Sequence, residues 1–141
     1  WHCHILSHEE MDMMRPMTAY VDRALPAVPV VSAIQDAITG DVTVVWTDGT
    51  PVSYNNLDTW WNIQNEVGYR ILRAEVAADG RVGTYLQIGN GLANQTQFLD
   101  QTALPGVTYS YIVVVFNAAG EVASASALES LPRFFLPILR K

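Results

Sequence analysis

The feature that most constrains the fold is a series of short runs, from about Val30 to Leu128, in which apolar and polar residues alternate. A period of two places successive side chains on opposite faces of a strand. Turn residues separate the runs, and helical periodicity is absent. About seven short strands in roughly 100 residues predict an all-β fold, an antiparallel β-sandwich.

The individual runs define the expected inner faces. Thr108 to Asn117 is the longest, and Asp41 to Thr47 has the same pattern. Their predicted inward residues are Tyr109, Tyr111, Val113 and Val115 in the first run and Val42, Val44 and Trp46 in the second. Further strands are expected where Tyr69, Ile71 and Arg73 alternate with Arg70 and Leu72, and at Val82–Ile88, Gln95–Asp100 and Glu121–Leu128, with turns at Ala78-Asp79-Gly80 and Ala118-Ala119-Gly120.

The stretch from Gly49 to Glu66 does not alternate and is long for a sandwich loop. It contains Trp60 and Trp61 among several asparagines and glutamines. We expect the loop to fold back and bury its tryptophans against the edge of the sandwich, because long loops usually pack through their own side chains. The alternative is an aromatic platform for a sugar or for a neighbouring domain.

Several positions between Val30 and Leu128 resemble a fibronectin type III domain. They are Trp46, Tyr69, the run Leu104-Pro105-Gly106-Val107-Thr108-Tyr109, Val113, Val115, Asn117 and Gly120. The resemblance implies a tyrosine corner at Tyr109, whose hydroxyl would bond back to the main chain. Such modules act as spacers, docking surfaces or ligand binders, so the fold does not imply chemistry of its own. Asn94-Gln95-Thr96 matches a glycosylation acceptor pattern.

Potential metal ligands are concentrated in the first thirteen residues. This segment holds all three histidines, the single cysteine and two of the four methionines. If residues 2–4 form a strand, His2 and His4 point to one side and Cys3 to the other. A thiolate, an imidazole and a weak thioether belong to the ligand set of a blue-copper site, which needs one more imidazole.

The pattern His-Cys-His-x3-His-x4-Met resembles the C-terminal copper signature of the multicopper oxidases. The resemblance implies that Cys3, His8 and Met13 are type 1 copper ligands, with Met13 axial, and that His2 and His4 bind the type 3 pair. It also implies one-electron oxidation of a small substrate at the type 1 copper and reduction of dioxygen to water at a trinuclear cluster. The axial Met is expected to lower the type 1 potential.

The remaining ligands of such an enzyme, and the cupredoxin barrel that would hold this strand, are missing from the 141 residues. We therefore expect the incomplete end of a cupredoxin domain at 1–24, a proline-rich linker at 25–29, the fibronectin-like domain at 30–128 and a tail at 129–141. The chain alone is expected to be inactive, and its alternative function is a non-catalytic binding or spacer module.

Other interpretations of the first segment stay open. Cys3, His4 and His8 could form a structural zinc site, and the isolated chain could bind copper or zinc adventitiously. Three methionines, Met11, Met14 and Met17, are expected to be packing residues rather than a copper-delivery cluster. The acidic residues Glu9, Glu10 and Asp12 are expected to be solvated or to support the copper ligands.

The net charge of −6 argues against a nucleic-acid partner, which needs a basic face. No apolar run is long enough to span a bilayer. The expected partners are the rest of an oxidase chain, a small reducing substrate and dioxygen. By the resemblance, the protein is exported to the periplasm or the extracellular space.

Overall fold

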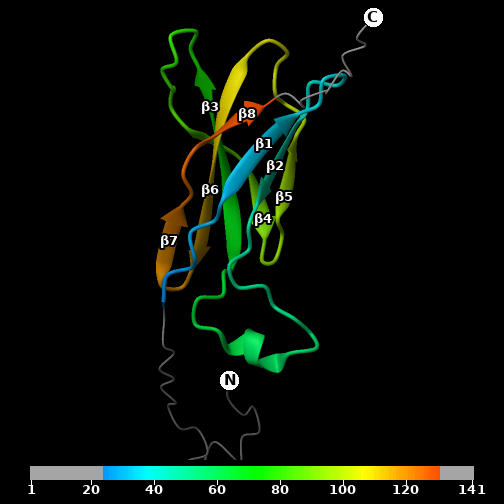
Figure 1. Ribbon diagram of the computed structural model, residues 1–141. Helices are drawn as coiled ribbons and strands as arrows, with labels where there is room; N and C mark the ends of the chain where they lie inside the picture. The colour runs from blue at the N-terminus through cyan, green and yellow to red at the C-terminus, as the bar shows by residue number, and fades with distance from the viewer. Residues whose placement is uncertain (1–23, 131–141) are drawn as a thin grey trace, which may run out of the picture.

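The computed structural model describes residues 24–130, and these form a sandwich of two antiparallel layers with one long loop at one end (Figure 1). In chain order the elements are β1 Val31–Gln35, β2 Val42–Trp46, the 3-10 helix η1 Leu57–Trp61, β3 Gly68–Val76, β4 Leu86–Leu92, β5 Gln97–Asp100, β6 Thr108–Asn117, β7 Gly120–Ala123 and β8 Ala127–Ser130. The antiparallel β-sandwich predicted from the alternating runs is confirmed, as is the fibronectin-like fold that the resemblance implied.

The first layer contains β1, β2 and β5. β2 lies between the other two and pairs antiparallel with both, with Ala33 opposite Val44 and Val44 opposite Phe98. The strand follows the predicted alternation, because Val42, Val44 and Trp46 are buried while Val45 is exposed. β-branched and aromatic side chains fit this half-buried pleated surface.

The second layer contains β4, β3, β6 and β7 in that order. β3 and β6 form its long central pair, which runs from Gly68 opposite Phe116 to Val76 opposite Thr108. A bulge between Ile71 and Leu72 shifts the register against β4. Such a bulge increases the local twist of the sheet.

The short strand β8 joins the two layers. Its first half pairs antiparallel with β6, where Leu128 lies opposite Ser110, and its second half pairs parallel with β1, where Glu129 lies opposite Ala33. The expected single run from Glu121 to Leu128 is therefore two strands, and β8 continues to Ser130. A strand that changes partner sheets closes one side of the sandwich.

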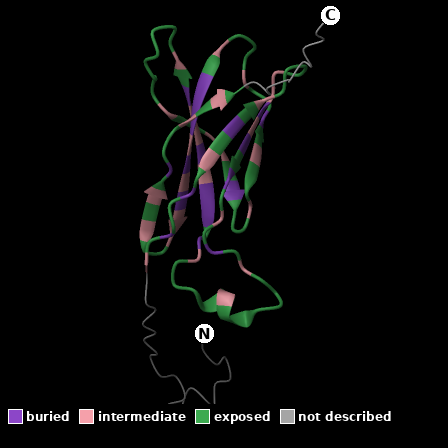
Figure 2. Ribbon diagram, viewed as in Figure 1, coloured by how far each residue is buried: buried purple, intermediate pink, exposed green. Residues whose placement is uncertain are grey.

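The core lies between the layers, where purple buried positions face each other in Figure 2. It consists of Ala33, Val42, Val44, Trp46, Tyr69, Ile71, Tyr109, Tyr111, Val113 and Val115. Trp46 and Tyr69 contact each other across the layers, with ring centroids 5.2 Å apart. Every inward residue predicted for Thr108–Asn117 is in this core.

The tyrosine corner and the turns also match the sequence. The backbone N–H of Leu104 donates to the hydroxyl of buried Tyr109 at 3.4 Å. Gly80 and Gly120 both have positive φ, at +82° and +145°, which explains glycine in these two turns. The expected strand at Val82–Ile88 starts later, since Val82 makes only an isolated bridge to Val76 and β4 begins at Leu86.

Candidate functional site

The predicted copper ligands His2, Cys3, His4, His8 and Met13 all lie outside the described residues, as does the predicted cupredoxin strand. Within residues 24–130 there is no cluster of three or more His, Cys, Asp or Glu side chains that could hold a metal ion. Copper binding by the first segment therefore stays a prediction. Likewise, no helix of the described part is long and apolar enough to cross a membrane.

The surface feature that stands out is the loop between β2 and β3, which we call the aromatic loop and define as residues 50–66. It projects from the end of the sandwich and carries η1 (Figure 1). Tyr54 is 86% exposed, Trp60 46% and Trp61 83%. The expectation that the tryptophans are buried against the sandwich edge is wrong. The physical reason is that hydrogen bonds within the loop hold its backbone in place, so its tryptophans need not pack against the strands.

A network of hydrogen bonds holds the loop together. The Thr59 hydroxyl accepts from the Ser53 N–H at 2.9 Å and donates to the Asn56 carbonyl at 2.7 Å. Asn56 caps η1, because its side-chain oxygen accepts from the Asp58 N–H. The Asn65 amide donates to the Thr59 carbonyl at 2.9 Å. These bonds fix the loop backbone without using its aromatic faces.

Trp60 is part of this network, whereas Trp61 is not. The Trp60 indole N–H donates to the Ser53 carbonyl at 3.0 Å, and its ring meets Tyr54 edge-on with centroids 5.6 Å apart. Trp61 lines a shallow pocket of about 500 Å³ together with Asp58, Asn62 and the backbone near Gly49. An exposed indole beside amide and carboxylate groups can stack on an apolar surface and hydrogen bond at its edge.

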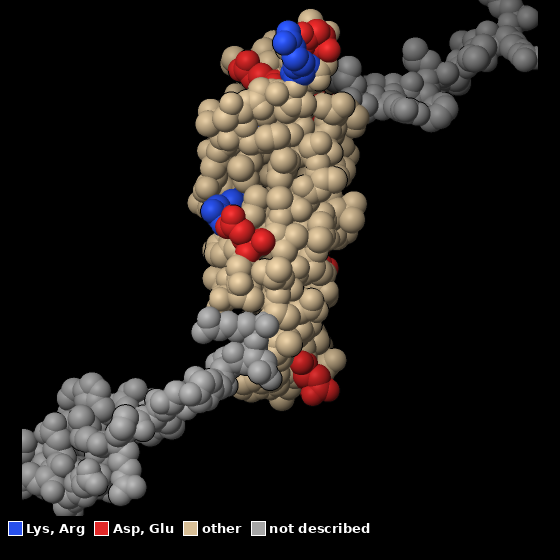
Figure 3. Space-filling view, turned by 90° about the vertical axis from the view of Figure 1, so that its left-hand side faces the viewer, with Lys and Arg blue, Asp and Glu red and all other residues tan. Residues whose placement is uncertain are grey.

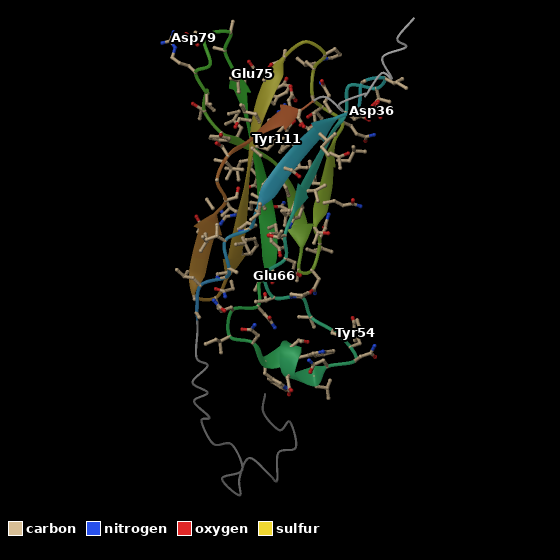
Figure 4. All side chains as sticks on the ribbon, viewed as in Figure 1. Asp36, Tyr54, Glu66, Glu75, Asp79 and Tyr111 are labelled. Carbon is tan, nitrogen blue, oxygen red and sulfur yellow. The ribbon has the colours of Figure 1, made fainter. Side chains whose placement is uncertain are left out.

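Glu66 ties the base of the loop to the sandwich (Figure 4). It is buried, and its two carboxylate oxygens accept from the Thr50 hydroxyl and the Asn94 N–H, each at 2.8 Å. Asn94 has a φ of +60°, and its side-chain oxygen accepts from the Val52 N–H at 2.8 Å. The predicted glycan acceptor Asn94 thus supports the loop through its side chain.

The described chain enters beside the same loop. The Ala24 N–H donates to the Ile63 carbonyl at 3.4 Å, and the Gln64 amide donates to the Leu25 carbonyl at 3.2 Å. Asn117, at the end of β6, donates to the Ala24 carbonyl at 2.8 Å. The described part of the chain therefore begins in contact with the aromatic loop.

A second polar cluster lies inside the sandwich, around Asp100. Arg73 Nη1 donates to Asp100 Oδ2 at 2.7 Å, and the Tyr111 hydroxyl donates to the same oxygen at 3.0 Å. The Thr102 N–H and hydroxyl donate to Oδ1 at 2.9 and 2.7 Å. The Arg73 guanidinium also lies 4.4 Å from the centre of the Tyr109 ring. Both carboxylate oxygens of Asp100 accept hydrogen bonds from neighbouring residues, so this cluster stabilises the fold.

The electrostatics of the cluster agree with a structural role. Burial opposes ionisation of Asp100, but the hydrogen bonds from Thr102, Arg73 and Tyr111 outweigh it, and the pKa of the carboxyl is lowered from 3.8. Burial and the neighbouring Asp100 raise the pKa of the Tyr111 phenol. The sequence grouped Arg73 with Tyr69 and Ile71 in one alternating run, and this was the available signal. Nothing in the pattern identified Asp100 as its partner.

Charge is sparse on the surface. Figure 3 shows one face on which Lys, Arg, Asp and Glu gather at a few spots and leave most of the sandwich uncharged. One of the ion pairs joins Arg70 to Glu121 across β3 and β7, and Arg70 also lies over the Phe116 ring at 5.2 Å. The exposed ion pair of Arg81 with Asp79 lies in the turn after β3. The uncharged face in view offers no basic surface for a phosphate backbone.

The two layers, the core tyrosine corner and the strand order define a fibronectin type III-like β-sandwich. Solved structures share this fold. A Fn3-like protein from Clostridium thermocellum matches with a TM-score of 0.56 at 20% identity, covering 79% of this chain and 98% of that one. The third fibronectin III domain of human KIAA0343 protein matches with a TM-score of 0.53 at 21% identity, covering 88% and 97%.

The same fold also occurs within a larger enzyme structure. Pectate lyase Pel3 from Pectobacterium carotovorum matches with a TM-score of 0.52 at 16% identity, over 72% of this chain and 27% of that one. No family model matches the chain. No curated protein matches it either. At these identities the likeness establishes the fold and leaves function to the surface of this chain.

Proposed function

We propose that the described residues form a non-catalytic spacer and contact module. The observation that carries this proposal is where the chain enters and leaves the sandwich, together with the position of the aromatic loop. The described chain enters at the end that carries the aromatic loop, and β8 ends at the opposite end of the sandwich (Figure 1). A rigid sandwich crossed from end to end would hold apart whatever is joined to its two ends. The aromatic loop supplies an exposed contact surface at the entry end.

The buried charged side chains of the module support this proposal, because their hydrogen bonds hold the fold together. Asp100 and Arg73 pair within the sandwich, and Glu66 is bonded to Thr50 and Asn94. A catalytic carboxylate would need a face open to substrate and a second group within reach of it. The oxygens of these two buried acids point at donors of the fold instead.

The second candidate function is that of the carboxyl end of a multicopper oxidase, and it is favoured by the pattern of the first thirteen residues. The donor set suits copper, since Cys3, His8 and Met13 provide a thiolate, an imidazole and a thioether, and His2 and His4 provide imidazoles for a second centre. Bound copper would supply one-electron redox chemistry. In that case the module is carried behind an exported oxidase domain, which meets a small reducing substrate and dioxygen.

An oxygen-uptake experiment tests the non-catalytic assignment of this chain. The 141-residue protein is loaded with Cu(II) and given a phenol in air, beside a Cys3→Ser variant and a Ser7→Ala control. We expect no uptake above that of Cys3→Ser, because one strand cannot complete the centres. Sustained uptake that needs Cys3 but not Ser7 would overturn the non-catalytic assignment.

The oxidase candidate is tested in a protein that joins this chain to an upstream copper domain. There Cys3→Ser is expected to abolish the blue absorbance and the oxidase activity while the thermal unfolding of the sandwich stays the same. Full activity of that variant would remove the second candidate and leave the module proposal standing.

A further inference from the structure

Two segments of the chain line the pocket beside Trp61, residues 49–51 and residues 58–62. The first is packed against the sandwich, since a Cβ added to Gly49 would lie 2.5 Å from the Cβ of Ala27. The second is held by the hydrogen-bond network of the aromatic loop. Because both segments are fixed, a ligand would meet a preformed site, and preorganisation lowers the cost of binding.

One face of η1 presents an aromatic ring and a carboxylate side by side. In a 3-10 helix the side chains at positions i and i+3 eclipse, so Asp58 and Trp61 lie on the same face of η1. Both residues line the pocket and both are exposed. This face therefore offers a flat apolar surface beside a hydrogen-bond acceptor.

Asn62, directly after η1, adds a hydrogen-bond donor to the same pocket. Its side-chain oxygen accepts from the Gln64 N–H at 3.0 Å, so the NH2 group is the part of the amide that can serve a ligand. The pocket volume of about 500 Å³ lies within the range of small-ligand sites, roughly 300–1,000 Å³. One stacking surface, one acceptor and one donor thus line a space of suitable size.

The charge of the loop narrows the class of ligand. Residues 50–66 carry Asp58 and Glu66 and contain no Lys, Arg or His. A phosphate backbone or an acidic polysaccharide would bring its negative groups to Asp58 with no cation of this loop to neutralise them. A purely apolar partner would bury the Asp58 carboxylate without a donor. The ligand that suits the pocket is uncharged, has a flat apolar face and carries hydroxyl groups at its edge.

We propose that this pocket binds a neutral saccharide of β-linked pyranoses with equatorial hydroxyls, one ring of which stacks on the Trp61 indole. Such a ring exposes axial C–H bonds on its faces and lies flat on an aromatic surface. Its hydroxyls, which both donate and accept, donate to the Asp58 carboxylate and accept from the Asn62 amide. This inference rests on the contact role proposed above and names the class of ligand that the module contacts.

The test is a titration of the full isotope-labelled chain with cellohexaose, and separately with xylohexaose, followed by NMR of the amide and indole N–H signals. Each of the four tryptophans contributes one indole signal, and Trp61→Phe identifies that of Trp61. We expect the signals of Trp61 and Asn62 to shift saturably with a Kd of about 1 mM, because the pocket is shallow and stacks a single ring. The indole signal of buried Trp46 should stay unchanged.

Three variants assign the binding to the pocket. Trp61→Ala should raise the Kd at least about tenfold, and Asp58→Ala about three- to tenfold. The matched control Tyr54→Ala removes an exposed aromatic ring from the same loop but outside the pocket, and it should leave the Kd unchanged. The thermal unfolding of each variant shows that the sandwich is folded.

Several results would overturn the proposal. They are no saturable shift with either sugar up to about 10 mM, an equal loss of binding in the Tyr54 and Trp61 variants, tighter binding of an oligogalacturonate or of oligothymidylate, and shifts that follow protein concentration without sugar. The last would assign the pocket to a second copy of the chain. The non-catalytic assignment would survive all of them, because it fails only if the copper-loaded chain consumes oxygen.

Discussion

At the scale of single residues, the carboxylate of Asp100 organises the polar groups inside the sandwich. It accepts from Arg73, Tyr111 and Thr102. Asp100→Ala leaves a guanidinium and a phenol without their acceptor, and we expect a loss of about 3 kcal/mol in the free energy of unfolding. Asp100→Asn keeps one acceptor oxygen and should cost less. Urea denaturation of both variants checks that Asp100→Ala loses more free energy of unfolding than Asp100→Asn, and equal losses would contradict this expectation.

The same carboxylate makes stability depend on pH. Its pKa in the folded chain is lowered from 3.8, so its contribution is complete above that value and is lost as the pH falls through the folded pKa. Between pH 6 and pH 2, the melting temperature should therefore fall more steeply for the natural chain than for Asp100→Asn. Parallel curves would mean that Asp100 does not contribute to the acid dependence.

Single residues also show which features of the fold a sequence pattern can predict. Alternation placed Val42, Val44 and Trp46 on one face, because a strand has a period of two and only one face meets the core. It grouped Arg73 with Tyr69 and Ile71 for the same reason. Its partner comes from β5 in the other layer. Which residues meet across layers depends on how the sheets pack, and no local pattern records that.

At the scale of elements, β4 and β5 lie close together where Gly89 faces the Phe98 ring. A Cβ added to Gly89 would lie 2.3 Å from Phe98 Cε2. We expect Gly89→Ala to cost about 1–3 kcal/mol through overpacking. The smaller Phe98→Leu should restore part of the loss when the two changes are combined. A double-mutant cycle by urea denaturation measures this coupling, and strictly additive losses would exclude a Gly89–Phe98 contact.

The aromatic loop depends on one anchor, Glu66. Glu66→Ala leaves the Thr50 hydroxyl and the Asn94 N–H without an acceptor, with a cost of about 1–3 kcal/mol. Amide exchange in residues 50–66 should rise more than exchange in β6. The control Glu75→Ala removes an exposed acid at the far end of β3 (Figure 4). It should change amide exchange neither in residues 50–66 nor in β6. A uniform rise across all strands would show that Glu66 supports the whole fold rather than the loop.

The loop also shows where sequence interpretation failed. Its length and its tryptophans were visible, and the rule that long loops usually pack through their own side chains predicted burial. The hydrogen bonds among Ser53, Asn56 and Thr59 make the loop self-supporting, so Trp61 can remain outside. This outcome depends on side-chain geometry at three polar residues, which an apolar pattern does not encode.

At the scale of the whole molecule, β8 decides whether the two layers remain joined on one side. It is the last described strand, yet it pairs with β1, the first, and with the central strand β6. A chain that ends after Ser126 loses both pairings and uncovers Ala33 and Tyr111 along their edges. A chain that ends after Ser130 keeps them. We expect the shorter chain to melt at least about 10 °C below the longer one, since a change of a few kcal/mol shifts Tm by this amount in a domain of this size. Differential scanning calorimetry of the two chains tests this expectation. Equal melting temperatures would mean that β1 and β6 hold the layers together without β8, and that the first and last strands contribute independently to the sandwich.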